Sequence, residues 1–272
     1  MESRKNAISA VFQQRGKSGG KALIPYISAG APDIGTTKKL VLEMAASGAD
    51  IIELGIPYSD PVADGPVIQQ ASLRALANGV TIRSIFELVA DLRRDTQIPL
   101  VLMAYYNSLL QYGIANFVGT CAAVGVNGLI VPDLPLEESG ELRAQAEPRG
   151  VDIILLVAPT TPANRIARIA EASRGFLYCV SVTGVTGMQR TIDNNLRDFL
   201  EVVRGQTSLP LSVGFGISTP DQAEAAAEMA DGVIVGSAII AIIEKHLGTD
   251  RLISEVGKFT QSLKSAIEGS PR

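Results

Sequence analysis

Residues 211–243 read LSVGFGISTPDQAEAAAEMADGVIVGSAIIAII, which is two successive units of a buried strand followed by a helix. Leu211–Val213 and Gly232–Val235 are short apolar runs without the polar alternation of a half-exposed strand, as is typical of parallel strands buried on both faces. Thr219-Pro220, after the first run, places a capping side chain before a proline at the first helical position. The stretch therefore predicts a parallel α/β architecture.

The same alternation extends over most of the chain. Amphipathic helical patterns fill the gaps between the apolar runs; Leu196, Phe199 and Val203, for example, follow helix spacing. The expected strands are Ala22–Ser28, Asp50–Leu54, Leu100–Met103, Gly128–Val131, Asp152–Val157, Phe176–Val180, Leu211–Val213 and Gly232–Val235. About eight such units in 272 residues predict a (β/α)8 TIM barrel that forms a single domain over residues 1–272. A doubly wound open sheet is the alternative, but no GxGxxG motif follows the first strand.

Extra helices are expected at two places. Residues 82–95 supply one in the long interval between the second and third strands. Residues 1–16 are expected to form another outside the barrel, where it covers the barrel bottom. A Thr161-Pro162 pair repeats the arrangement of cap and proline, so a barrel helix is expected to begin there.

The composition excludes several classes of protein. Apolar residues make up 46% of the chain, too many for a disordered protein, and no apolar run approaches the roughly 18 residues of a membrane span. The net charge of −4 argues against non-specific nucleic-acid binding. Two cysteines cannot form a disulfide framework, which suits a reducing compartment. We therefore expect a cytoplasmic protein, or one of the plastid stroma if the source bears plastids, with no nucleic-acid or membrane partner.

Glycine-bearing turns follow three consecutive strands of the expected barrel. Thr183–Gly187, Gly214–Ser218 and Gly236–Ala238 come after strands six, seven and eight. TIM barrels often hold phosphate after strands seven and eight, where backbone N–H groups and a helix N-terminus face the ligand. Each turn alone could be turn geometry, but the three together predict phosphate binding.

Carboxylates are expected at the same end of the barrel. Glu53 ends the second strand, where a buried carboxylate needs either a functional task or a hydrogen-bonded structural partner. The loop of residues 56–66 follows, with three prolines and the acids Asp60 and Asp64, which could equally be turn formers. Its length and stiffness predict a lid. Tyr178, within strand six, could face a ligand or fill the core.

The scarcity of other reactive groups narrows the chemistry. The chain has one histidine, His246, and none of its lysines ends a strand at the mouth of the expected barrel. This excludes a multi-histidine metal site and disfavours both Ser-His-Asp catalysis and a Schiff-base aldolase. Acid–base chemistry must then rest mainly on carboxylates, tyrosines or lysines, and any carbon–carbon cleavage needs its electron sink in the substrate itself.

Five segments carry a recognisable series of motifs: Pro25–Gly30, Glu53–Pro66, Pro132–Ser139, Gly184–Gly187 and Gly214–Ser218. The longest and most specific is Glu53–Pro66, which reads ELGIPYSDPVADGP. In content and order, the series resembles the tryptophan synthase alpha subunit family. The resemblance implies a lyase of tryptophan biosynthesis that cleaves indole-3-glycerol phosphate to indole and D-glyceraldehyde 3-phosphate, with no metal and no cofactor of its own.

The resemblance also implies roles for single residues. Glu53 matches the general acid–base that protonates the indole carbon bearing the side chain. Asp64 matches the aspartate that stabilises charge on the ring nitrogen and accepts its proton, and Tyr178 matches a tyrosine near the reacting side chain. The implied substrate-binding residues are Tyr26 and Phe215 at the indole ring, Thr186 on a loop that closes over the site, and Gly187, Gly216, Gly236 and Ser237 at the phosphate.

A partner is implied as well. The family's beta subunit binds pyridoxal phosphate and receives indole through an internal tunnel, in an α2β2 complex. The residues that resemble positions at or near this contact are Pro57, Tyr58, Asp60, Asn107 and Asp133. Val182-Thr183 and Tyr58 depart from the frequent family residues, which leaves the coupling to the partner open. The alternatives are a stand-alone lyase that releases free indole, another phosphate-binding barrel enzyme, and a non-catalytic scaffold.

Overall fold

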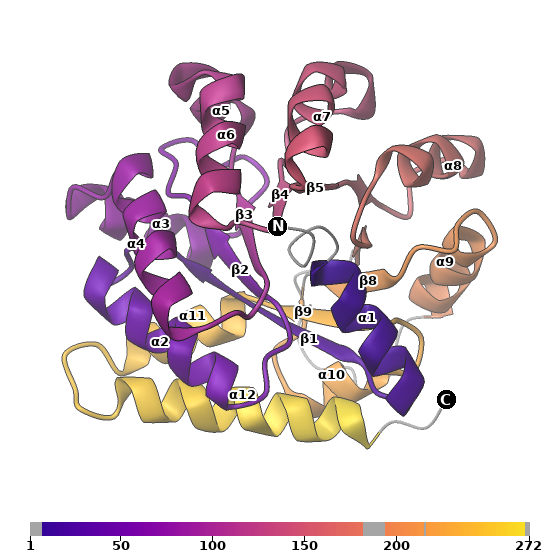
Figure 1. Cartoon of the computed structure of the whole chain (residues 1–272). Coiled ribbons are helices and arrows are strands. Elements are labelled where there is room, and N and C mark those ends of the chain that lie inside the picture. Colours follow the sequence, from indigo (N-terminus) through magenta and orange to yellow (C-terminus); the bar gives the residue numbers. More distant parts are fainter. Residues whose placement is uncertain (1–6, 182–193, 215, 270–272) are drawn as a thin grey trace.

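A parallel β-sheet forms the centre of the molecule, and helices surround it (Figure 1). The computed structural model describes residues 7–181, 194–214 and 216–269. In this part of the chain, nine strands pair in the order β5-β4-β3-β2-β1-β9-β8-β7-β6. They are β1 (Ala22–Ser28), β2 (Ile52–Gly55), β3 (Leu100–Met103), β4 (Gly128–Ile130), β5 (Asp152–Ile154), β6 (Leu156–Val157), β7 (Leu177–Val180), β8 (Leu211–Gly214) and β9 (Gly232–Val235).

Two of these strands, β5 and β6, are the halves of one expected strand. Leu155 lies between them, and its carbonyl accepts a hydrogen bond from Tyr178 N of β7 at 3.0 Å. Since β5 pairs with β4 and β6 pairs with β7, the chain through Leu155 completes the barrel. The predicted TIM barrel is confirmed, and the observed strand ends lie within two residues of the expected ones.

The helices follow the strands in the expected alternation. They are α1 (Ala7–Ser18), α2 (Ile34–Ala46), α3 (Pro66–Ala77), α4 (Ile82–Asp95), α5 (Tyr106–Tyr112), α6 (Ile114–Val124), α7 (Gly140–Ala146), α8 (Ala163–Ala172), α9 (Asn194–Arg204), α10 (Pro220–Ala227), α11 (Ser237–Lys245) and α12 (Leu252–Glu268), with short 3₁₀ turns η2 (Leu136–Glu138) and η3 (Glu147–Arg149). The extra helix expected at residues 82–95 is confirmed as α4. The expected cap at Thr161 is wrong, because Thr161 Oγ1 accepts a hydrogen bond from Ala158 N at 3.0 Å and Pro162 occupies the N-cap position of α8.

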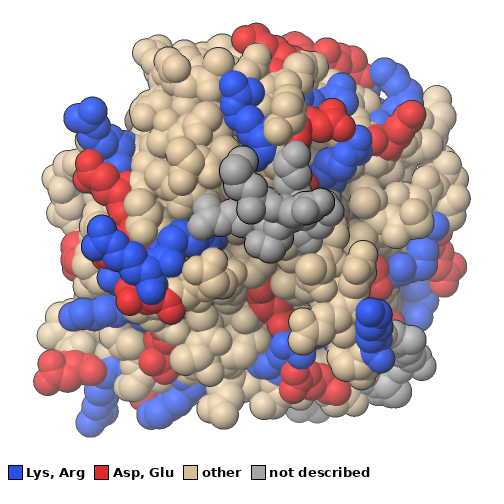
Figure 2. Space-filling view, viewed as in Figure 1, with Lys and Arg blue, Asp and Glu red and all other residues tan. Residues whose placement is uncertain are grey.

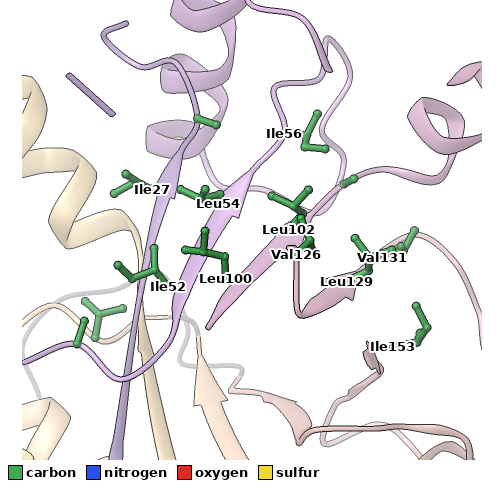
Figure 3. Close-up of a cluster of buried hydrophobic side chains, with 14 of the residues drawn as sticks. Ile27, Ile52, Leu54, Ile56, Leu100, Leu102, Val126, Leu129, Val131 and Ile153 are labelled. Atoms are coloured by element: carbon green, nitrogen blue, oxygen red, sulfur yellow. The ribbon is translucent and has the colours of Figure 1, made fainter. Parts of the chain in front are cut away.

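Side chains alternate between the barrel interior and an apolar layer under the helices. Ile52 and Leu54 of β2 belong to that layer and pack near Leu102 of β3 (Figure 3). Ile51 belongs to the interior cluster instead. Because successive strand residues point to opposite faces, Glu53 shares the side of Ile51 and projects into the barrel. The alternation of one short strand thus decides where this carboxylate lies.

Helix α1 packs against the N-terminal ends of the strands. Its Ile8 and Phe12 are buried in the interior cluster, where the rings of Phe12 and Phe176 lie 5.6 Å apart. Gly128 and Gly232, the first residues of β4 and β9, make room for them: an added Cβ would lie 2.9 Å from Ile8 Cδ1 and 3.2 Å from Phe12 Cε1. The expected N-terminal helix is therefore confirmed over residues 7–18, and it covers the barrel bottom.

A buried ionic network fastens the same end of the barrel. Asp50, just before β2, accepts hydrogen bonds from Leu23 N at 2.7 Å, Arg15 Nε at 2.6 Å and Lys264 Nζ at 2.8 Å. Arg15 belongs to α1, Leu23 to β1 and Lys264 to α12. One carboxylate thus joins the first and last helices of the described chain to the N-terminal end of the sheet. Functional sites of TIM barrels lie at the other end, where the strands have their C-termini.

The molecular surface carries charges of both signs. On the face shown in Figure 2, Lys and Arg side chains are interspersed with Asp and Glu side chains. Within the described ranges, no helix is both long and apolar enough to cross a membrane.

Candidate active site

Glu53 is a buried carboxyl group inside the barrel. It is 1% exposed, and its Oε2 has no hydrogen-bond partner among the described residues. Burial, followed by the negative charge of Asp64, raises the pKa of Glu53 to about 8. Glu53 is therefore mainly protonated at neutral pH, and it can donate a proton.

Asp64 is the second carboxyl group of the site and lies in the segment between β2 and α3. Its backbone is held by a bond from Asp64 N to Pro61 O at 3.0 Å and by a bond from Gln69 Nε2 to Asp64 O at 2.9 Å. Tyr105 Oη donates a hydrogen bond to Asp64 Oδ2 at 3.1 Å. Burial raises the pKa of Asp64 to about 6, against the opposing effect of the Tyr105 hydrogen bond. Asp64 is therefore mainly ionised at neutral pH and can accept a proton.

The two carboxyl groups form a complementary acid–base pair. Between about pH 6 and pH 8, the pKa values of Asp64 and Glu53 make the first a carboxylate and the second a neutral acid. A pair of titratable groups whose environments separate their pKa values can divide the roles of acid and base in one reaction. In the part of the chain that the structure describes, no group of three or more His, Cys, Asp and Glu side chains could hold a metal ion.

Two tyrosines from other strands face the same interior. Tyr26 of β1 and Tyr178 of β7 are buried, and a Cβ added at Gly55 or Gly214 would overlap the hydroxyl of Tyr26 or Tyr178 respectively. Burial is the largest cause that raises the pKa of both phenols. The negative charge of Asp64 raises the pKa of Tyr26 further, and the negative charge of Glu53 raises that of Tyr178. The tyrosines and the carboxyl groups therefore share one electrostatic environment, and both phenols stay neutral.

The expected phosphate-binding positions fall partly in the described chain. Gly216 has a φ of +85°, a left-handed conformation that favours glycine. Gly236 is the N-cap of α11, and Ser237 is exposed as the first residue of that helix. Such a helix N-terminus after a barrel strand presents backbone N–H groups to an anion. The other expected substrate-binding residues, Thr186, Gly187 and Phe215, lie outside the described residues.

The expected partner-contact residues differ in exposure. Pro57 is buried and Tyr58 is half-buried, whereas Asp60, Asn107 and Asp133 are exposed. Asp60 Oδ2 accepts a hydrogen bond from Ser59 Oγ at 2.5 Å. Asp133 Oδ1 accepts one from Tyr106 N at 2.9 Å, so this side chain, which follows β4, binds the N-terminus of α5. The structure thus brings the segments after β3 and β4 together at the barrel mouth.

Apolar side chains are exposed on the same segments. Val62, in the loop that contains Asp60, is 83% exposed. Leu110, on α5 with Asn107, is 52% exposed. Both side chains are therefore accessible on the segments that carry the expected partner-contact residues Asp60 and Asn107.

Sequence reasoning missed Tyr105. This residue lies two positions after β3, and its hydroxyl binds the segment that carries Asp64. The available signal was its place just past the carboxyl end of a barrel strand, where site residues gather in this fold. No local pattern indicates that its hydroxyl reaches a residue 41 positions earlier in the chain.

Comparison with protein families gives a match over almost the whole chain. The family described as "Tryptophan synthase alpha chain" matches residues 12–268. The tryptophan synthase alpha chain of Geobacter sp. (strain M21) is 47% identical over 260 residues, which cover 96% of this chain and 97% of that protein. The corresponding chain of Citrifermentans bemidjiense is 48% identical over 260 residues, with the same coverage.

Solved structures resemble the whole barrel. Tryptophan synthase subunit alpha from Legionella pneumophila superposes with a TM-score of 0.89 at 37% identity, and the match covers 96% of this chain and 98% of that chain. A structure of Mycobacterium tuberculosis tryptophan synthase matches with a TM-score of 0.88 at 35% identity, over 96% of this chain and 98% of that chain.

Proposed function

Because this chain belongs to the tryptophan synthase alpha chain family, we propose that Glu53 and Asp64 are the acid–base pair with which it performs the alpha reaction. The chain is a carbon–carbon lyase of tryptophan biosynthesis that cleaves indole-3-glycerol phosphate to indole and D-glyceraldehyde 3-phosphate. The observation that carries the proposal is the division of protonation states, with the pKa of Glu53 at about 8 and that of Asp64 at about 6.

The proposed reaction needs one proton donor and one acceptor. Neutral Glu53 gives its proton to the indole carbon that bears the side chain, and the positive charge that develops on the ring nitrogen is stabilised by ionised Asp64. The bond from this carbon to the side chain then breaks, and its electron pair returns to the ring. The side-chain hydroxyl becomes the aldehyde as it loses its proton, which the Glu53 carboxylate takes up. Protonation of the ring thus makes the electron sink inside the substrate.

The remaining site residues position the substrate in this proposal. Tyr178 lies near the reacting side chain, and Tyr26 and Phe215 enclose the indole ring. The phosphate is held by backbone groups of Gly187, Gly216 and Gly236 and by the hydroxyl of Ser237. Thr186 belongs to a loop that closes over the site. Binding of the phosphate, remote from the reacting bond, supplies orientation that favours the chemical step.

The family also determines the cofactor and the partner. The alpha chain has no cofactor of its own, and pyridoxal phosphate belongs to the beta subunit, with which it forms an α2β2 heterotetramer. We place the contact at the exposed segments of the barrel mouth, on Pro57, Tyr58, Asp60, Asn107 and Asp133. We also propose a cytoplasmic location, because the relatives named above are bacterial.

Indole release from indole-3-glycerol phosphate tests the proposed roles. The assay uses the purified chain alone and with a tryptophan synthase beta subunit. Glu53→Gln and Asp64→Asn should each lower kcat/KM by a factor on the order of 10² to 10⁴, because each removes an acid or base from the transition state. For the unaltered chain, kcat/KM should follow a bell-shaped pH profile with limbs near the two pKa values, about 6 and about 8.

Asp152→Asn is the matched control. Asp152 begins β5 at the opposite end of the barrel, and burial raises its pKa to about 6 as well. This variant should retain the activity of the unaltered chain. Near-normal turnover by a folded Glu53→Gln chain would contradict the assignment. Fast cleavage without the beta subunit that does not change on its addition would instead identify a stand-alone lyase.

A further inference from the structure

The hydroxyl of Tyr105 makes two hydrogen bonds, and both reach the segment that carries Asp64. Tyr105 Oη accepts a bond from Ala63 N at 2.9 Å and is 3.1 Å from Asp64 Oδ2. A backbone N–H can only donate, so the single proton of the phenol is available for Asp64. The geometry therefore fixes the direction of the second bond: the phenol donates, and the carboxyl oxygen accepts.

The ring of Tyr105 is held on several sides. It is 2% exposed and stacks on Tyr58, with ring centroids 5.0 Å apart and an interplanar angle of 20°. The next residue, Tyr106, donates its backbone N–H to Asp133. A side chain packed in this way has little rotamer freedom left to lose, so its hydroxyl is already placed for Asp64.

We propose that Tyr105 is a positioning residue that keeps Asp64 in its ionised, proton-accepting form through the Tyr105 Oη–Asp64 Oδ2 hydrogen bond. This inference rests on the proposed role of Asp64 in the cleavage reaction. Tyr105 acts through Asp64, and the proposal gives it no contact with the substrate.

The surroundings of Asp64 show why it needs such a donor. The titratable groups that interact with it are Glu53 of β2, Tyr26 of β1, Tyr178 of β7 and Tyr105 itself. None of these is a cation, and among the described residues Tyr105 Oη is the one hydrogen-bond donor to the Asp64 side chain. A bond to the charged form of a buried carboxyl favours ionisation. Without the hydrogen bond from Tyr105, the pKa of Asp64 would rise toward that of Glu53. The pH range in which Asp64 is ionised while Glu53 is protonated would then become narrower.

Tyr105→Phe tests the inference, with Tyr106→Phe as the matched control. The first substitution deletes the hydroxyl and keeps the ring that stacks on Tyr58. The second deletes a neighbouring phenol oxygen that makes no hydrogen bond to the residues that the structure describes. We expect Tyr105→Phe to move the acid limb of the kcat/KM profile upward by about one pH unit, since a hydrogen bond to a charged group has about that effect. At pH 6, kcat/KM should fall about fivefold relative to the unaltered chain, since the ionised fraction of Asp64 would drop from about one half to about one tenth, and the fall should be small near pH 8. Tyr106→Phe should leave the limb in place.

A second readout does not depend on activity. Carbon-13 NMR of aspartate-labelled chain follows the titration of the Asp64 carboxyl directly, and we expect the same upward shift in Tyr105→Phe. In the unaltered chain, the Tyr105 Cζ resonance should respond at the pH where Asp64 titrates, which tests the bond even if the variant does not fold. An unchanged Asp64 titration, or a loss of kcat that is equal at every pH, would overturn the inference. If the unaltered chain released no indole, the proposed function would fail, and the NMR titrations would still decide whether Tyr105 controls Asp64.

Discussion

The environment of Glu53 favours its neutral form. The carboxyl is buried in the barrel, and the causes that act on its pKa are burial and the like charge of Asp64, both of which raise it. Ionisation of this carboxyl is less favourable in the folded state than in the unfolded chain, because water hydrates the carboxylate in the unfolded chain. The same feature that provides a proton donor at neutral pH therefore lowers the stability of the fold at high pH.

The stability effect has a definite sign. The pKa of Glu53 rises from 4.5 to about 8 on folding, so its favourable contribution is complete below pH 4.5 and is lost as the pH rises through 8. Glu53→Gln, which cannot ionise, should raise the free energy of unfolding by roughly 2–4 kcal/mol at pH 9 and have little effect at pH 4. Urea unfolding of both chains at the two pH values measures this difference.

An exposed glutamate provides the comparison. Glu171→Gln, at the surface of α8, should change the unfolding free energy little at either pH. An equal effect of Glu53→Gln at pH 4 and pH 9 would show that the change in stability does not come from ionisation of Glu53.

Residues differ in how far sequence alone could place them. Glu53 could be proposed from its place at the end of a buried strand, whereas Asp64 could equally have been a turn former and received a role only from the family resemblance. The hydrogen bond of Tyr105 to Asp64 could not be predicted, since it joins two loops that become neighbours only when β2 and β3 pair. Asp133 shows the same limit: it was expected at a partner contact, and its binding to Tyr106 N depends on the pairing of β3 with β4.

At the scale of elements, apolar patterns predicted strands better than caps. The run Asp152–Val157 predicted one strand, yet the ladder breaks at Leu155, where each half meets a different neighbouring strand. Curvature of this kind depends on closure of the whole barrel and leaves no local signal. Thr161 failed as a cap because a competing turn bond from Ala158 N occupies its hydroxyl. Thr219 accepts a bond from Gln222 N at 3.3 Å, so the cap expected there is confirmed.

Helix α5 provides a prediction about the partner. Leu110 is exposed on it, close in sequence to Asn107, and an exposed leucine that becomes buried in a complex stabilises that complex. Leu110→Asp should weaken binding of a tryptophan synthase beta subunit by roughly 10- to 100-fold, because the interface would have to bury a charge. Isothermal titration calorimetry with the two purified chains measures the affinity.

A surface valine on another side of the barrel serves as control. Val202 is 48% exposed on α9, which lies apart from α5 around the barrel (Figure 1). Val202→Asp introduces the same charge and should leave the affinity unchanged. Equal weakening by the two variants would point to a general effect of charge or of stability, and normal binding by Leu110→Asp would remove α5 from the interface.

At the scale of the molecule, the first and last described parts of the chain contact one another. We propose that residues 1–272 form a single domain, because β1 pairs with β9 and Lys264 of α12 binds Asp50 before β2. A cut between the halves of the chain would separate paired strands on both sides of the barrel. The two ends of the barrel also differ in role. Helix α1 and the Asp50 network stabilise the bottom, and the carboxyl pair lies toward the mouth.

This difference between the two ends predicts that stability and activity can be changed independently. Phe12→Ala removes a buried ring that contacts Phe176, and it should lower the free energy of unfolding by about 3–5 kcal/mol. Its kcat/KM at 25 °C should stay near that of the unaltered chain, whereas Glu53→Gln should lower kcat/KM by a factor on the order of 10² to 10⁴ and stabilise the fold at pH 9. Gln14→Ala, on the exposed side of α1, is the control for the helix itself.

The double variant decides whether the two ends of the barrel are energetically separate. Changes at sites without shared contacts usually add to within about 0.5 kcal/mol, so Phe12→Ala with Glu53→Gln at pH 9 should have the sum of the two single effects. Urea unfolding of the four chains completes the cycle. A coupling above about 1 kcal/mol would mean that the interior apolar cluster, to which Phe12 belongs, responds to both changes. The bottom of the barrel would then belong to the same energetic unit as the catalytic carboxyl, and substitutions that stabilise α1 would be expected to alter the pKa of Glu53.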